Sequence, residues 1–162
     1  TEIEAALREY QRLFGGAEHG DTLQEQRRTA LEAMRLLEEF APRLVGPVLN
    51  GTATSHSDIS LHVFADQPEN VTLRLIDLGL PHELGERRVK MDAERSQNLP
   101  VVRFEAGGRT IDALVFPIDG IRQAPYSPVD GRPMRRADRR EVSELLRQHL
   151  TSTASFDITH LS

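Results

Sequence analysis

Residues 50–64 read NGTATSHSDISLHVF, from Asn50 to Phe64. The first half is a turn of small and hydroxyl residues, and the second half is an apolar strand that begins after the carboxylate of Asp58. A turn of glycine and hydroxyl residues lets backbone N–H groups approach a phosphate closely. An acid placed just after such a turn could hold a divalent cation against that phosphate. The stretch therefore predicts a phosphate-binding turn that leads into a strand.

Side chains along the predicted strand alternate between its two faces. The polar positions are Asp58, Ser60 and His62, and the apolar positions are Ile59, Leu61 and Val63. The apolar face belongs against helices. The polar face is costly to bury on a strand with apolar neighbours unless it lines a cleft. We therefore expect a polar cleft on one side of the sheet.

A second isolated acid, Asp112, lies within the apolar run of residues 109–116. An unpaired carboxylate in such a run is expensive to ionise, so we expect a partner, which could be an arginine, another cation or a metal ion. The structural alternative for Asp112 is a salt bridge to Arg74, Arg103 or another arginine. The structural alternative for Asp58 is a turn or cap residue. From the residues alone, both alternatives stay open.

Length and composition indicate one globular domain. The chain has 162 residues, of which 38% are hydrophobic and 28% charged, and we expect the domain at 1–150 with a polar tail at 151–162. It has no cysteine, which excludes disulfides and thiolate metal sites. No run approaches the roughly 20 apolar residues of a membrane helix, so we expect a cytoplasmic protein without membrane partners. The net charge of −5 argues against extended nucleic-acid binding, which requires a broad basic face.

Hydrophobic periodicity and turn residues outline the elements. Helices are expected at 2–14, from Asp21 or Thr22 to about Phe40, at 68–79 and from Asp138 onward, and strands at 44–49, 59–64, 82–91, 100–106 and 109–116. Gly107-Gly108 predicts a tight hairpin between the last two strands. Pro47 cannot donate to a ladder, so its strand should have an edge position, a bulge or a late start. Four prolines and two glycines make 117–134 a loop.

Five arginines lie within nine residues around the start of the last predicted helix. They are Arg132, Arg135, Arg136, Arg139 and Arg140. Cations are unfavourable at a helix N-terminus, so a bound anion would relieve their repulsion. If functional, the cluster would hold a polyphosphate or an acidic acceptor such as a tRNA end. The alternative is a solvated basic face that pairs with the acids of the first two helices.

The turn, the acid and the strand together resemble the signature of the nucleotidyltransferase superfamily, in its DNA polymerase β-like minimal form. That signature is Gly-Ser, a short spacer, Asp-x-Asp on a strand, and a third acid on a neighbouring strand. On this resemblance Gly51 and Thr52 match the Gly-Ser pair, Asp58 matches the first acid and Asp112 the third. Ser60 stands in the place of the second acid, and the spacer is shorter than is usual. The chain therefore resembles a degenerate member.

The resemblance implies an α+β fold, with a mixed sheet of about four to five strands and helices mainly on one face. It also implies transfer of a nucleotidyl group from an NTP to an unknown acceptor. Asp58 and Asp112 would be catalytic and would bind Mg²⁺ or Mn²⁺. The residues expected to contact the nucleotide are Gly51, Thr52, Ser60, Arg135 and Arg136.

Ser60 bears directly on activity, because a neutral hydroxyl cannot balance a second Mg²⁺ as a carboxylate does. His62, on the same strand face, could act as a substitute metal ligand, although imidazole suits Zn²⁺ or Mn²⁺ better than Mg²⁺. The alternative for His62 is a hydrogen-bonded histidine that lines a cleft. His56 is expected to be exposed. We therefore predict weak or lost catalysis, with a non-catalytic nucleotide-binding or protein-binding module as the alternative function.

Overall fold

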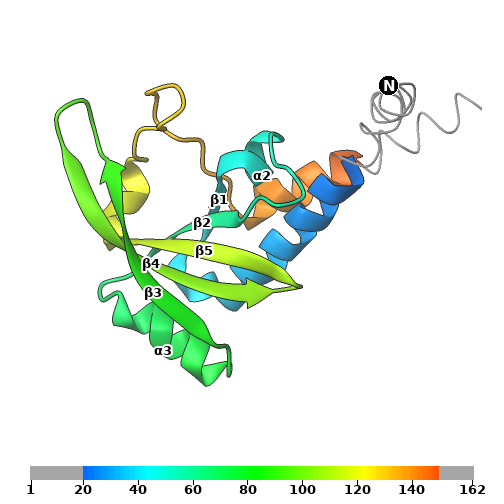
Figure 1. Ribbon diagram of the computed structural model, residues 1–162, viewed down its shortest axis with the longest axis horizontal. Coiled ribbons are helices and arrows are strands. Elements are labelled where there is room, and N and C mark those ends of the chain that lie inside the picture. The colour runs from blue at the N-terminus through cyan, green and yellow to red at the C-terminus, as the bar shows by residue number, and fades with distance from the viewer. Residues whose placement is uncertain (1–19, 150–162) are drawn as a thin grey trace, which may run out of the picture.

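The computed structural model describes residues 20–149 and is built around a five-stranded sheet in the order β1-β2-β5-β4-β3 (Figure 1). The strands are β1 (Arg43–Val45), β2 (Ile59–Phe64), β3 (His82–Lys90), β4 (Ser96–Ala106) and β5 (Arg109–Phe116). β2 and β5 run parallel, whereas the other neighbouring strands are antiparallel. The predicted α+β class with a mixed sheet is confirmed.

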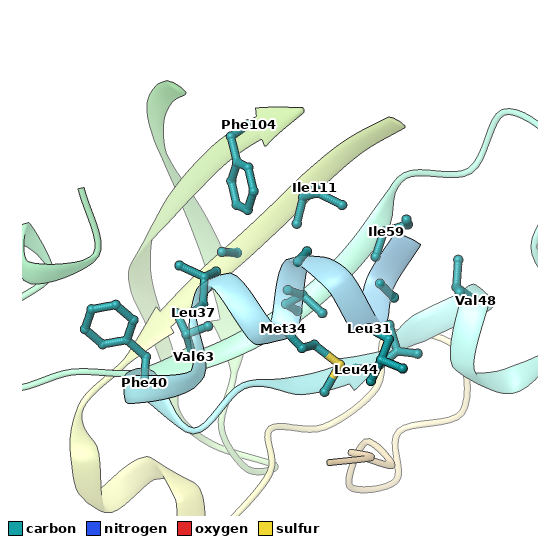
Figure 2. Close-up of a cluster of buried hydrophobic side chains, with 14 of the residues drawn as sticks. Leu31, Met34, Leu37, Phe40, Leu44, Val48, Ile59, Val63, Phe104 and Ile111 are labelled. Carbon is teal, nitrogen blue, oxygen red and sulfur yellow. The ribbon is translucent and has the colours of Figure 1, made fainter. Parts of the chain in front are cut away.

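Helices pack against one face of this sheet. They comprise residues 20–36, the short α2 (Gly46–Asn50), α3 (Glu69–Asp77) and residues 139–149, with 3-10 turns η1 (Glu38–Phe40) and η2 (Ile118–Arg122). Figure 2 shows Leu31, Met34 and Leu37 of the first helix directed at side chains of the strands. Their partners include Ile59, Val63, Phe104 and Ile111, which alternation places on the same sheet face.

The apolar face of β2 is buried as its pattern predicted. Ile59, Leu61 and Val63 are all completely buried in the main core. Full burial of such a side chain contributes about 1.5–3 kcal/mol, which fixes the strand register strongly. The polar positions of β2 must therefore face the other side of the sheet, which the helices leave open.

The predicted strand at 44–49 is wrong beyond Val45. The chain turns at Gly46, which has φ +75°, and enters α2. Pro47 lies in the first turn of α2, where a backbone N–H is not needed and a fixed φ is favourable. The proline that seemed awkward for a strand is therefore a helix-starting residue.

Other boundaries follow the sequence closely. The strands at 59–64 and 109–116 are confirmed, and the strand predicted at 82–91 ends at Lys90. Gly107 and Gly108 both have positive φ, as a tight hairpin requires. β4 begins at Ser96 rather than at Pro100, because its antiparallel ladder with β3 extends to that residue. Figure 1 shows this β3–β4 hairpin reaching beyond the other strands.

The last helix begins at a reciprocal cap. The Glu141 N–H donates to Asp138 Oδ1 over 2.9 Å, and the Asp138 N–H faces Glu141 Oε1 at 3.5 Å. The helices at 20–36 and 69–77 are likewise confirmed, and the 117–134 loop includes η2. The predicted helix at 2–14 and tail at 151–162 lie outside the described residues. Across 20–149, no helix has the length and apolar character that crossing a membrane requires.

Candidate functional site

Strand pairing brings the polar positions together on the open face of the sheet. Ser60 lies directly beside Asp112 on parallel β5, and Asp112 lies opposite Arg103 on antiparallel β4. Asp58 precedes Ser60 by two residues and is exposed, whereas Asp112 is almost fully buried. Residues far apart in sequence thus form one row across three strands.

Asp112 is held by two arginines. Arg103 Nε donates to Asp112 Oδ1 over 2.7 Å, and Arg103 Nη2 donates to Oδ2 over 3.3 Å. Arg87 Nη2, from β3, donates to the same Oδ2 over 3.3 Å. The Asp112 hydrogen bond and charge raise the pKa of Arg103, and the charges of Asp58 and Glu83 act in the same direction. The salt-bridge alternative for Asp112 is confirmed, with Arg103 and Arg87 as its partners.

The carboxylate of Asp112 is therefore paired with arginines and is not left free to share a metal ion with Asp58. The negative charges of both acids act on Arg103 and raise its pKa, with Asp112 contributing most. Arg74, the other proposed partner of Asp112, instead donates to Leu36 O and lies 3.7 Å from a carboxylate oxygen of Glu39. Asp112, Arg103 and Arg87 therefore form an ion-pair network on the open face of the sheet.

His62 is buried and hydrogen-bonded. Its Nδ1 accepts a hydrogen bond from Arg136 Nε over 3.0 Å, and its ring lies 4.6 Å from the ring of Phe116, centre to centre. Burial, and then the positive charges of Arg136 and Arg87, lower the pKa of His62 to about 3. The imidazole is therefore neutral near pH 7, with its proton on Nε2. The hydrogen-bonded alternative for His62 is confirmed.

Arg136 is partly buried and is not among the residues that line the cavity described below. Its guanidinium carbon is 4.9 Å from the ring centres of both Phe64 and Phe116, and its Nη1 donates to Gly120 O over 2.9 Å. Burial, and then the charge of Arg43, lower the pKa of Arg136 to about 10. The expected nucleotide contact of Arg136 is therefore replaced by a packing and hydrogen-bonding role.

A cavity of about 840 Å³ opens on the same face of the sheet. Its floor includes Ser60, His62 and Leu114, and one wall is formed by the β1–α2 turn. The end of β3 and the loop at 125–135 complete the enclosure; Figure 1 shows this loop in gold. Neither Asp58 nor Asp112 belongs to the lining.

The cavity lining is strongly cationic. Its charged residues are Arg87, Arg88, Lys90, Arg132, Arg135 and Asp130. The lining residues thus include five cations and a single acid. The rest of the lining is largely apolar and includes Val89, Leu114, Tyr126 and Met134. A cationic rim around an apolar interior suits an anionic ligand that also has an apolar part.

The arginine cluster divides into separate roles. Arg132 and Arg135 line the cavity, as the anion-binding hypothesis expects. Arg139 pairs with Glu38, which agrees with the alternative of a basic face paired with helix acids. Arg136 packs over two aromatic rings, and Arg140 is exposed. Sequence clustering alone could not separate these roles, because the helix start directs adjacent residues in different directions.

The predicted phosphate-binding pair is placed differently from expectation. Gly51 ends α2 in the left-handed region at φ +85°, and its N–H donates to Pro47 O. Thr52 follows it and does line the cavity. Gly46 and Pro47 at the start of α2 also line the cavity, and a Cβ on Gly46 would lie 3.7 Å from that of Ser60. A Gly-Pro pair after an apolar run was the overlooked signal for this turn.

The loop from Gly51 to Asp58 is anchored from the first helix and from β5. Gln26 Nε2 donates to Thr54 O over 2.8 Å, and Arg109 Nη1 donates to Ser55 O over 3.1 Å. Arg109 also forms paired hydrogen bonds with Glu25, whose pKa it lowers. His56 is exposed as predicted. The loop is therefore positioned by contacts outside the cavity.

Arg27 supports the other end of this loop. Its Nε and Nη2 donate to the Val48 and Leu49 carbonyls at the end of α2, over 3.0 and 2.8 Å. Burial, and then the charge of Arg135, lower the pKa of Arg27. Arg135 and Arg27 are therefore close enough to repel one another, which an anion bound near Arg135 would relieve.

The donor set does not fit the Mg²⁺ ions that the resemblance implies. Both carboxylate oxygens of Asp112 accept hydrogen bonds from arginines, and Ser60 supplies only a neutral hydroxyl. The Nδ1 of His62 accepts from Arg136. Within residues 20–149, no cluster of three or more His, Cys, Asp or Glu side chains could hold a metal ion. Magnesium requires oxygen ligands with compensating negative charge.

No protein-family model and no curated protein matches the chain. Solved structures that resemble part of it include a cytoplasmic RNA terminal U-transferase (19% identity, TM-score 0.40), Cid1 in complex with the UTP analog UMPNPP (16%, 0.44) and the GLD-2/RNP-8 complex (16%, 0.35). The alignments cover 57%, 70% and 65% of this chain, and 28%, 37% and 48% of those chains, respectively.

These similar structures are nucleotidyltransferases, the superfamily that the sequence signature resembles. The chain spans less than half the length of each matched chain.

Proposed function

We propose that this domain binds a nucleotide in the 840 Å³ cavity and does not transfer its nucleotidyl group. The observation that carries the proposal is the cavity lining, in which five cations and one acid surround apolar walls. A volume of this size lies within the usual range for small-molecule sites, about 300–1,000 Å³. The ligand class that combines several negative charges with an apolar ring system is a nucleoside polyphosphate.

The two kinds of lining suggest how such a ligand would lie. Its phosphates would be drawn to the arginines and lysine at the end of β3 and in the 125–135 loop, since guanidinium groups match phosphate geometry. Its base and sugar would pack against the apolar side chains, of which Tyr126 offers an aromatic face. Thr52, Ser60 and Asn50 supply neutral hydrogen-bonding groups.

Metal-dependent transfer is less well supported by the same geometry. It requires acids that are available to bind metal, and Asp112 is already paired with two arginines. Transfer by the superfamily's mechanism would leave Asp58 as the one free carboxylate of the three to bind metal, because Ser60 replaces the second acid. We therefore assign Asp112 to the ion-pair network, and propose no acceptor and no catalytic role for Asp58 or Asp112.

A thermal-shift panel with ATP, GTP, CTP and UTP tests this proposal. At least one nucleotide should raise the melting temperature, since a ligand present at 100 times its Kd stabilises the folded state by about 2.7 kcal/mol. Arg135→Ala should weaken that shift. Arg140→Ala is the matched control, because Arg140 is exposed near the same helix start and does not line the cavity.

Three outcomes would contradict the proposal. No shift with any of the four nucleotides would remove nucleotide binding. Release of pyrophosphate that Asp58→Asn abolishes would instead establish transfer. A shift that Arg140→Ala and Arg135→Ala reduce equally would place the ligand outside the cavity.

A further inference from the structure

We infer that the cavity takes its nucleotide as the metal-free anion, so that Mg²⁺ opposes binding. This inference rests on the proposed function and gives the site its regulation by divalent cations. It reverses the usual relation between a nucleotide and Mg²⁺, in which the ion bridges phosphate to protein carboxylates.

The first observation is that arginine side chains already bind the carboxylate that a Mg²⁺ ion would need as a ligand. Asp112 lies beside Ser60 in the register of β2 and β5, and Arg103 holds it through two nitrogens. Arg87 completes the arrangement with a third hydrogen bond at 3.3 Å. A divalent cation could reach this carboxylate only by displacing two arginines from a nearly buried acid.

The second observation is that Arg87 belongs to both arrangements. It pairs with Asp112 and also lines the cavity, and its side chain is 44% exposed. The ion-pair network therefore extends into the cavity wall through a cation. A phosphate near Arg87 would find the positive charge that a bound Mg²⁺ supplies in a metal-dependent site.

The third observation is the charge balance around the cavity. Asp130 is the one acid among its lining residues, against five cations, of which Arg87 is also paired with Asp112 behind the lining. The floor adds no negative charge, because Ser60 is neutral and burial holds the His62 imidazole in its neutral form. A free divalent cation is repelled by this field, and a chelated nucleotide has lost part of the charge that attracts it.

Isothermal titration of the whole chain tests the inference directly. Each of the four NTPs is titrated in EDTA, and again with millimolar MgCl₂ in excess of the nucleotide. The ionic strength is matched with NaCl, since salt alone weakens such binding. We expect the Kd of the best ligand to be at least about tenfold weaker with Mg²⁺, a difference of about 1.4 kcal/mol.

The outcomes separate the inference from the proposed function. Binding that is equal or tighter with Mg²⁺ would overturn the inference and leave nucleotide binding in place. No heat and no competition under either condition would remove the proposed function itself. Tripolyphosphate serves as a second probe, and its affinity should show the same sensitivity to Mg²⁺ because the effect acts on the phosphates.

A pair of variants at Ser60 provides an independent test. Ser60→Asp places a second acid beside Asp112 and near the guanidinium groups, so it should weaken binding in EDTA about tenfold or more. Ser60→Asn matches the size of the new aspartate without its charge, so binding in EDTA should be about tenfold or more weaker in Ser60→Asp than in Ser60→Asn. If Ser60→Asp instead bound nucleotide more tightly with Mg²⁺ than without it, Asp112 would be available to metal, and the inference would fail.

Discussion

Two sites on the open face of the sheet stabilise partly buried arginines in different ways. In the ionic site, Arg87 and Arg103 hold the carboxylate of Asp112, and both guanidinium groups remain partly exposed. In the aromatic site, Arg136 lies over the adjacent rings of Phe64 and Phe116 and donates to the neutral imidazole of His62. No carboxylate of residues 20–149 forms an ion pair with Arg136.

The contrast explains the electrostatics of both sites. A buried acid at the ionic site balances cations that stay available to solvent or ligand. The aromatic site has no such acid, so Arg136 loses hydration and the neighbouring histidine must stay neutral. The ionic site is thus suited to binding an anion at the surface, whereas the side chains of the aromatic site pack beneath the floor of the cavity.

The largest expected effect comes from breaking the aromatic site at Phe116. This ring is 1% exposed and contacts His62, Phe64 and Arg136. Phe116→Ala should lower the free energy of unfolding by about 3–5 kcal/mol, because it leaves a cavity and removes the ring from the cation. Urea denaturation measures this loss. Phe116→Leu, which keeps most of the volume, should cost less than about 1.5 kcal/mol.

A loss below about 1.5 kcal/mol in Phe116→Ala would show that the aromatic site is loosely packed. The support that it gives to the cavity floor would then be in doubt. The ratio of the two losses separates packing from the specific contribution of the ring.

The next effect is a pH dependence that only the aromatic site should produce. The pKa of His62 falls from an unfolded value of 6.5 to about 3 in the fold. Between these values the unfolded chain binds the extra proton, so stability is full above pH 6.5 and falls as the pH drops toward 3. The expected slope is about 1.4 kcal/mol per pH unit in that window.

His62→Asn removes the titrating group and keeps an oxygen that can accept from Arg136. Urea unfolding of both proteins at several pH values between 4.5 and 7 gives the difference, in which the titration of the carboxylates largely cancels. The wild type should lose more stability than His62→Asn as the pH falls. Parallel curves would mean that His62 is not held neutral by burial.

The ionic site is expected to be less sensitive, because its arginines are partly exposed. Arg87→Met should lower the free energy of unfolding by about 1 kcal/mol, since Arg103 still holds Asp112 and solvent screens the lost pair. Arg88→Met is the matched control on the same strand, expected to change stability by less than about 0.5 kcal/mol. Chemical denaturation at low and high salt checks both values.

Equal losses for the two substitutions would show that Arg87 contributes through its aliphatic stem rather than through Asp112. A loss for Arg87→Met that disappears at high salt would confirm the electrostatic account.

Sequence patterns located the elements and the polar strand face, because period-two alternation and hairpin glycines are local signals. Ile59, Leu61 and Val63 were assigned correctly to the core for this reason. The start of α2 was missed because Pro47 was considered within a strand, although proline also begins helices. Local chemistry allowed both interpretations, and the left-handed turn at Gly46 decided between them.

The candidate site was less predictable, since its partners come from distant strands. Asp112 was expected to need a partner, but Arg87 is on β3, 25 residues earlier in the chain, and was not singled out. The cavity depends on the β3 end meeting the loop at 125–135, which no local pattern encodes. The metal roles proposed for Asp58, Asp112 and His62 remain predictions of the resemblance, and the observed donor set argues against them.

Among the substitutions within the two sites, Arg136→Met should have the smallest effect on stability. The substitution removes a cation–π contribution of about 0.5–2 kcal/mol, but it also removes the cost of burying an unpaired charge. Because these terms oppose each other, the free energy of unfolding should change by less than about 1 kcal/mol.

The informative measurement on Arg136→Met is the protonation of His62, read from long-range proton–nitrogen NMR correlations. In the wild type, Nδ1 accepts from Arg136, so the proton should be on Nε2 alone. Loss of the arginine removes this constraint and a positive charge, so both tautomers should appear and the pKa of His62 should rise. Arg43→Gln, a neighbouring cation without this hydrogen bond, should leave the tautomer unchanged. If the Nε2 tautomer persisted in Arg136→Met, some other group would have to fix the imidazole, and the hydrogen bond from Arg136 would not be what sets the tautomer of His62.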